Sequence, residues 1–101
     1  MGCDIYLFRK DACSESLDHG EIFWEVKSWD LGYELALVGM GDHYQAICLD
    51  VLHELAQDLI HKGKEDCGEY PDGALKALLE DLGDLDQDQR FNSLWYLTMD
   101  Y

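Results

Sequence analysis

The sequence predicts a small α+β domain in which a three-stranded antiparallel sheet packs against a long central helix and one or two shorter C-terminal helices. Residues 3–39 contain short segments in which apolar and polar side chains alternate, as in half-buried strands. Residues 42–63 and 74–82 instead repeat apolar side chains at helical spacing. A chain of 101 residues is expected to form one domain, 1–101, with its sheet in 3–39 and its helical part in 42–101.

The sheet is expected to come from the N-terminal part of the chain. Residues 3–8, CDIYLF, alternate along their length and are predicted to form a central strand. Residues 21–29, EIFWEVKSW, alternate in the same way. The tripeptide Asp-Leu-Gly at 30–32 is typical of a turn, so residues 33–38 are expected to return as a third strand.

The long central helix is predicted over residues 42–63. Asp42 and Gln45 stand at the spacing of a capping box, and Gly63 suits the left-handed residue that ends a helix. Cys48 lies within the apolar stripe and is expected to be a small core residue. The stripe consists of Tyr44, Ile47, Cys48, Val51, Leu52, Leu55, Ala56, Leu59 and Ile60.

The C-terminal part contains one clear helix and one ambiguous segment. Apolar residues at helical spacing predict a helix over 74–82, ended by Gly83. Asp86 and Gln89 have the spacing of another capping box, which favours a helix after them, whereas SLWYLTMDY has the aromatic bias of a strand. We prefer the helix for residues 90–101.

The charge of the chain restricts its partners. Seven Lys and Arg stand against 22 Asp and Glu, giving a formal net charge of -15. Such a chain is repelled by nucleic acids and anionic membranes, because both are polyanions. Solubility alone requires a net charge of magnitude only ~2–8 in a small domain. We therefore expect a basic protein partner, with no direct nucleic-acid binding and no membrane binding.

Acidic residues gather around the predicted helix at 74–82. They could present carboxylates in a file, much as a nucleic-acid backbone presents phosphates, and Trp29 and Tyr70 are candidate aromatic anchors of the same contact. The alternative interpretation is a solvated helix end and loop. The candidate partner-binding acids are Glu65, Asp66, Glu69, Asp72, Glu80, Asp81, Asp84, Asp86 and Asp88.

No motif predicts catalysis, a metal or a cofactor. His53 and Glu54 begin a near match to the zinc-protease HExxH pattern, but Gln57 replaces the second histidine. Residues 84–88 imitate the opening of a calcium loop, yet Gln89 and Trp95 stand where that loop needs Gly and Glu. The prediction is therefore a protein that is not an enzyme, and a small enzyme or metal-dependent protein is kept as the second alternative.

The cysteines and the N-terminal region indicate the compartment. Four cysteines stand far apart with no CxxC pair, and no charged region followed by an apolar region marks a secretory signal. We expect reduced thiols in the cytoplasm. No apolar run reaches the ~18 residues of a membrane-spanning helix.

The opening MGCDIYLF resembles the start of small phage-encoded proteins that begin MGCDI, which usually carry His where this chain has Tyr6. In size and acidity the chain is also similar to the anti-CRISPR inhibitors of host defence. This resemblance implies a small phage inhibitor that blocks a basic nucleic-acid-binding surface of another protein. The alternative, an immunity protein or antitoxin that neutralises a basic nuclease toxin, requires the same acidic surface and stays open.

Overall fold

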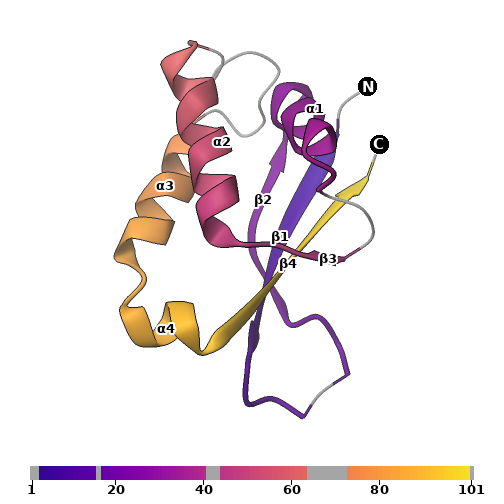
Figure 1. Cartoon of the computed structure of the whole chain (residues 1–101), viewed down its shortest axis with the longest axis vertical. Coiled ribbons are helices and arrows are strands. Elements are labelled where there is room, and N and C mark those ends of the chain that lie inside the picture. The colour runs from indigo at the N-terminus through magenta and orange to yellow at the C-terminus, as the bar shows by residue number, and fades with distance from the viewer. Residues whose placement is uncertain (1–2, 16, 41–43, 64–72, 101) are drawn as a thin grey trace.

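Four antiparallel strands form one sheet in the order β2-β1-β4-β3 (Figure 1). The structure is a computed structural model that describes residues 3–15, 17–40, 44–63 and 73–100. The strands are β1 (Asp4–Asp11), β2 (Glu21–Lys27), β3 (Gln45–Ala46) and β4 (Ser93–Asp100). The helices are α1 (Trp29–Leu37), α2 (Leu49–His61), α3 (Ala74–Asp84) and α4 (Gln87–Phe91).

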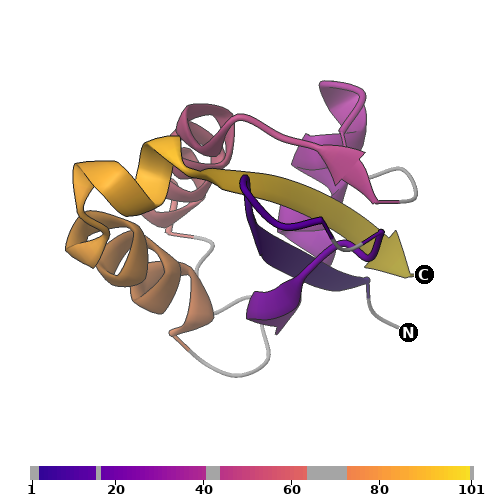
Figure 2. The ribbon, with the colours of Figure 1, turned by 90° about the horizontal axis from the view of Figure 1, so that it is seen from below.

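The helices form a layer against one face of the sheet. Figure 2 shows α2, α3 and α4 gathered on the same side, and α2 packs against both α3 and α1. The Trp24 indole Nε1 donates to the Ala74 carbonyl at 3.0 Å, which ties β2 to the start of α3. The Arg90 guanidinium donates to the Leu82 carbonyl at 2.8 Å, so α4 satisfies a carbonyl left free near the end of α3. The opposite face of the sheet carries no helix in the described part of the chain.

The hydrophobic core lies between this helical layer and the two central strands. In the β1–β4 register Ile5 stands opposite Met99 and Leu7 opposite Leu97, so alternate side chains of both strands point to the helices. A bulge in the β1–β2 pairing turns Phe23 to this side and packs it edge-on against Trp95. The fully buried residues of the core are Cys3, Ile5, Leu7, Leu31, Leu35, Leu52, Ala56, Leu78, Leu82 and Leu97.

Several sequence predictions are confirmed. The protein is a mixed α+β domain, and the strand predicted at 3–8 is central, although it extends to Asp11. Its alternate residues Cys3, Ile5 and Leu7 are buried. The strand predicted from 21 and the helix predicted from 74 are present. Asp86 and Gln89 form the predicted capping box, with Asp86 Oδ1 accepting from the Gln89 amide at 2.6 Å. Gly63 has the expected positive φ of 73°.

The predicted third strand at 33–38 is wrong. Residues 33–37 belong to α1, and Val38 is its C-cap. The helix begins at Trp29, inside the strand predicted for 21–29 and just before the turn predicted for 30–32. The Ser28 hydroxyl accepts from the Leu31 amide at 3.2 Å and caps the helix, and Leu31 and Leu35 lie one helical turn apart in the core. The buried residues of α1 are Leu31, Gly32 and Leu35, at spacings of one and four. One face of a helix accommodates this spacing, whereas a strand would turn Gly32 to the opposite face.

The long helix begins later than predicted. Gln45 and Ala46 pair with β4, and the Ile47 amide donates to the Trp95 carbonyl at 3.0 Å. The backbone of residues 45–47 therefore forms hydrogen bonds of the sheet rather than of a helix. Gln45 therefore cannot complete a capping box, and Asp42 lies outside the described residues. Cys48 precedes the helix and is exposed, which contradicts its predicted place in the core.

The C-terminal segment is the largest correction. Residues after α4 form β4 rather than the preferred helix, and β4 pairs along its whole length with β1. Ser93, Trp95 and Leu97 are buried at alternate positions, which is a strand pattern. The sheet therefore has four strands rather than three, and the expected division into a sheet at 3–39 and a helical part at 42–101 does not hold.

Candidate partner-binding surface

The acidic residues of α3 lie on its solvent side. Its apolar residues Leu75, Leu78 and Leu82 are buried, which leaves Glu80, Asp81 and Asp84 exposed. Within the described residues none of these three carboxylates is hydrogen-bonded or ion-paired. They meet the first requirement of an electrostatic contact surface, because their charge is not neutralised locally.

The two acids beside α4 have local structural roles as well. Asp86 is the N-cap of α4, and Asp88 accepts from the side-chain amide of Asn92. Both are exposed, and both suit the positive end of the α4 dipole. Their place near the end of α3 agrees with the predicted acidic run, but each carboxylate already stabilises the chain around it.

A second file of acids lies on α2. Asp50, Glu54 and Asp58 are exposed and follow one another at intervals of four residues, about 6 Å along the helix axis. Asp58 pairs with Lys62 at 2.8 Å, and this hydrogen bond, the Asp58 charge and more distantly the Glu34 charge raise the pKa of Lys62. Asp50 and Glu54 make no ion pair with the described residues.

A hollow of about 570 Å³ lies between the two helices. Apolar Ile60 and Leu79 line it beside the acids Glu54 and Asp58. It is open to solvent. We name the exposed acids of the two helices together the acidic helical surface: Asp50, Glu54, Asp58, Glu80, Asp81 and Asp84. The composition of a negative rim around an apolar floor matches protein contact sites, which bury an apolar centre inside a polar margin.

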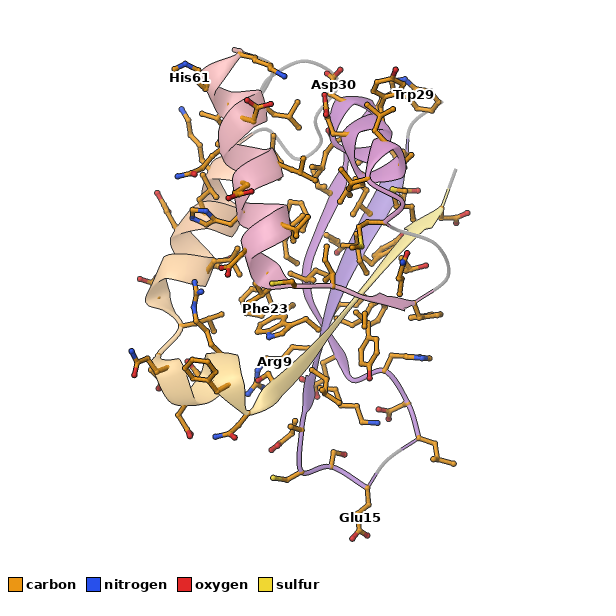
Figure 3. The ribbon with its side chains drawn as sticks, viewed as in Figure 1. Arg9, Glu15, Phe23, Trp29, Asp30 and His61 are labelled. Atoms are coloured by element: carbon orange, nitrogen blue, oxygen red, sulfur yellow. The ribbon has the colours of Figure 1, made fainter. Side chains whose placement is uncertain are left out.

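The sequence predicted Trp29 at the end of a strand, but in the structure Trp29 is the first residue of α1. Its side chain is 55% exposed, and Tyr33 and Leu37 follow at four-residue intervals with exposures of 59% and 64%. The three form an apolar stripe on a helix that packs beside α2 (Figure 3). An exposed stripe with Trp and Tyr is typical of a contact surface, because these side chains give large burial at low entropic cost.

The remaining predicted contact residues fall outside the described part of the chain. These are Glu65, Asp66, Glu69, Tyr70 and Asp72.

The structure does not support either of the two weak metal-binding patterns, the near match to HExxH and the calcium-loop-like residues 84–88. His53 is half-buried on α2, and residues 84–88 run from the last turn of α3 into the first turn of α4 rather than around one centre. Across the described ranges, no group of three His, Cys, Asp or Glu side chains is arranged to hold a metal ion.

Comparison with known proteins places the chain near no relative. No protein-family model matches it, and neither a curated protein nor a solved structure is significantly similar to it. Among the described helices, none combines the length and the apolar character needed to cross a membrane. The fold therefore defines a small α+β domain, and any function has to be argued from its surface.

Proposed function

We propose that the protein binds the basic, nucleic-acid-binding surface of another protein and blocks it, as the anti-CRISPR inhibitors of host defence do. The observation that carries this proposal is the acidic helical surface, where α2 and α3 expose five carboxylates that no described cation neutralises: Asp50, Glu54, Glu80, Asp81 and Asp84.

The spacing of these charges supports the proposal. Neighbouring acids on α2 are about 6 Å apart along the helix axis, which is less than the ~8 Å over which physiological salt screens a charge. Their potentials therefore add, and a net charge of -15 extends the field beyond this surface. A basic groove that accepts a phosphate backbone would be attracted by the same field.

The exposed apolar stripe of α1 would slow dissociation of the complex, which charge alone does not do. Electrostatic attraction mainly accelerates encounter and sets specificity, whereas a slow dissociation needs apolar side chains that become buried. Trp29, Tyr33 and Leu37 lie in the same helical layer as the acids and would serve as these anchors. In this proposal no residue has a catalytic role, and no cofactor takes part.

An immunity protein that neutralises a basic nuclease toxin would use the same surface. The two functions differ in the partner: a defence effector in one case and a toxin encoded beside the inhibitor in the other. The nature of the captured partner and the neighbouring genes therefore separates them.

The test is capture followed by competition. The immobilised protein is exposed to a bacterial lysate, the retained partner is identified by mass spectrometry, and the purified partner is bound to a fluorescent nucleic acid. We expect the protein to displace that nucleic acid with one-to-one stoichiometry. Formation of a ternary complex, with the nucleic acid still bound, would contradict the proposal.

A further inference from the structure

The face of the sheet that no described helix covers is strongly aromatic. The β1–β4 register places Tyr6 opposite Thr98 and Phe8 opposite Tyr96, and all four point away from the core. A hollow of about 440 Å³ lies on this face. Its lining consists of Tyr6, Phe8, Ile22, Tyr44, Thr98, Met99 and Asp100. We call it the sheet-face hollow.

Packed rings hold one wall of this hollow in place. The Tyr44 ring lies 5.2 Å from Phe8, and His19 from the β1–β2 loop stacks on Tyr44 at 4.2 Å with an interplanar angle of 11°. The same imidazole meets Tyr96 edge-on at 5.2 Å. The Tyr44 ring is thus packed between the Phe8 and His19 rings. Its backbone has φ of 51°, a conformation that residues other than glycine rarely adopt. The wall is a preformed aromatic surface.

Carboxylates surround the same hollow. Asp100 lines it, and Glu25 stands opposite Tyr6 on the neighbouring strand. Burial of the phenol, together with the charges of Asp4, Glu25 and Asp100, raises the pKa of Tyr6. Lys27 offsets Asp4 at 3.8 Å, but Glu25 and Asp100 have no ion-pairing cation among the described residues. An aromatic hollow in a negative field favours a cation over a neutral or anionic ligand.

We infer that the sheet-face hollow receives an arginine side chain of the basic partner. The planar guanidinium can stack on the Tyr6 ring, which lies opposite Thr98 and so only two residues along the sheet from Asp100, while its N–H groups donate to the Asp100 carboxylate. Cation–π attraction and charge-assisted hydrogen bonds then act together. Lysine fits less well, because its ammonium is a compact and strongly hydrated point charge. The inference rests on the proposed function for the source of the arginine, but the recognition chemistry belongs to this hollow alone.

The test uses a small probe instead of the partner. The ¹⁵N-labelled protein is titrated with N-acetyl-arginine methylamide, and the amide signals are followed by NMR. We expect saturable shifts at Tyr6, Phe8 and Thr98, and weaker ones with the lysine analogue. The neutral citrulline analogue has nearly the same shape without the charge, and it is expected to give no saturable shift.

Variants locate the contact. Asp100→Asn removes the charge at an exposed strand end, and Tyr6→Leu removes the ring beside it; each should raise the dissociation constant roughly three- to tenfold. Glu80→Gln on α3 is the matched control, because it removes one charge outside the hollow, and it should leave the constant unchanged. The spectrum of each free variant shows that it is folded.

Three results would overturn the inference: equal binding of the citrulline analogue, shifts confined to α2 and α3, or affinity that neither Asp100→Asn nor Tyr6→Leu changes. None of these results bears on the proposed function, which is tested separately by displacement of the partner's nucleic acid.

Discussion

Gly32 of α1 lies against Cys3 so closely that a Cβ on Gly32 would stand 2.7 Å from the Cys3 Sγ. This contact lets α1 approach the edge of the core, where Cys3 and Leu31 are fully buried. The absence of a side chain at this position is therefore a packing requirement, and it explains why a helix tolerates glycine at its centre.

Substitution of Gly32 should be destabilising. Gly32→Ala forces Cys3 or the helix to shift, and we expect a loss of about 1–3 kcal/mol, less the helix propensity gained. Gly83→Ala is the matched control, because Gly83 lies in α3 with nothing within 4 Å of its added Cβ, and it should stabilise by ~0.5–1 kcal/mol. Urea denaturation of both variants measures the difference. If both raised stability, α1 would not pack as described.

The thiol of Cys3 should be inert in the folded protein. Burial, followed by the charges of Asp4 and Asp100, raises the pKa of Cys3 above 9.0, so the reactive thiolate is suppressed. Cys13 and Cys48 are exposed. We expect iodoacetamide at neutral pH to label these two and to spare Cys3 until the protein is unfolded, which peptide mass mapping can follow. Rapid labelling of native Cys3 would contradict its burial.

The same shift has a consequence for alkaline stability. A thiol whose pKa is higher in the folded than in the unfolded state holds its proton longer when folded. Its contribution is complete below pH 9.0, the unfolded pKa, and is lost as the pH rises towards and through the folded pKa. Stability should thus decline above about pH 9, and the decline should be smaller in Cys3→Ala when both are melted across pH 7–11.

Two buried serines provide a matched pair. Ser28 and Ser93 are 2% and 8% exposed, but the Ser28 hydroxyl caps α1, whereas the Ser93 hydroxyl has no hydrogen-bond partner among the residues that the structure describes. Ser28→Ala should cost ~0.5–2 kcal/mol through the lost cap. Ser93→Ala removes an unsatisfied buried group and should be neutral or stabilising. Thermal melts of the two variants decide; an equal loss would mean that Ser93 has a partner.

The core face of α2 predicts which leucines matter most. The sequence places Val51 and Leu55 in the centre of the apolar stripe, but both are only half-buried, and Leu52, Ala56 and Leu59 face the core. Leu52→Ala should cost about 2–5 kcal/mol, and Val51→Ala under about 1 kcal/mol. Chemical denaturation of each variant tests this order, and a larger loss for Val51→Ala would reverse the assigned face.

These cases show why some elements could be predicted and others could not. The helix α3 and the cap of α4 follow from local signals, because leucine spacing and the Asp86–Gln89 pair need no distant contact. The strand β3 forms by pairing with β4. Because β4 lies about fifty residues further along the chain, no local sequence pattern predicts this pairing. For α1 a local signal did exist: Ser28 followed by acidic Asp30 marks a helix start, but the turn propensity of 30–32 obscured it.

The candidate surface was predictable only in part. The acids of α3 could be placed from helical spacing, whereas the stripe of Trp29, Tyr33 and Leu37 requires knowing that these residues are helical. The sheet-face hollow joins residues from β1, β2 and β4 with Tyr44, which precedes β3, so no local pattern reveals it.

The central claim is that the acidic helical surface attracts the basic partner. The measurement is the association rate constant for the captured partner as a function of salt, for the parent and two double charge reversals. Glu80→Lys/Asp84→Lys changes α3, and Glu15→Lys/Glu21→Lys changes the β1–β2 loop and the first residue of β2; the tip of this loop lies away from α3 (Figure 3). Each Glu→Lys or Asp→Lys substitution raises the net charge by two, so both double variants move from -15 to -11. They differ only in where the charges are changed.

The account predicts that the α3 reversal lowers the rate constant roughly tenfold at low salt and flattens its salt dependence, while the loop reversal has a much smaller effect. Equal rate constants and equal salt slopes for the two variants would contradict it.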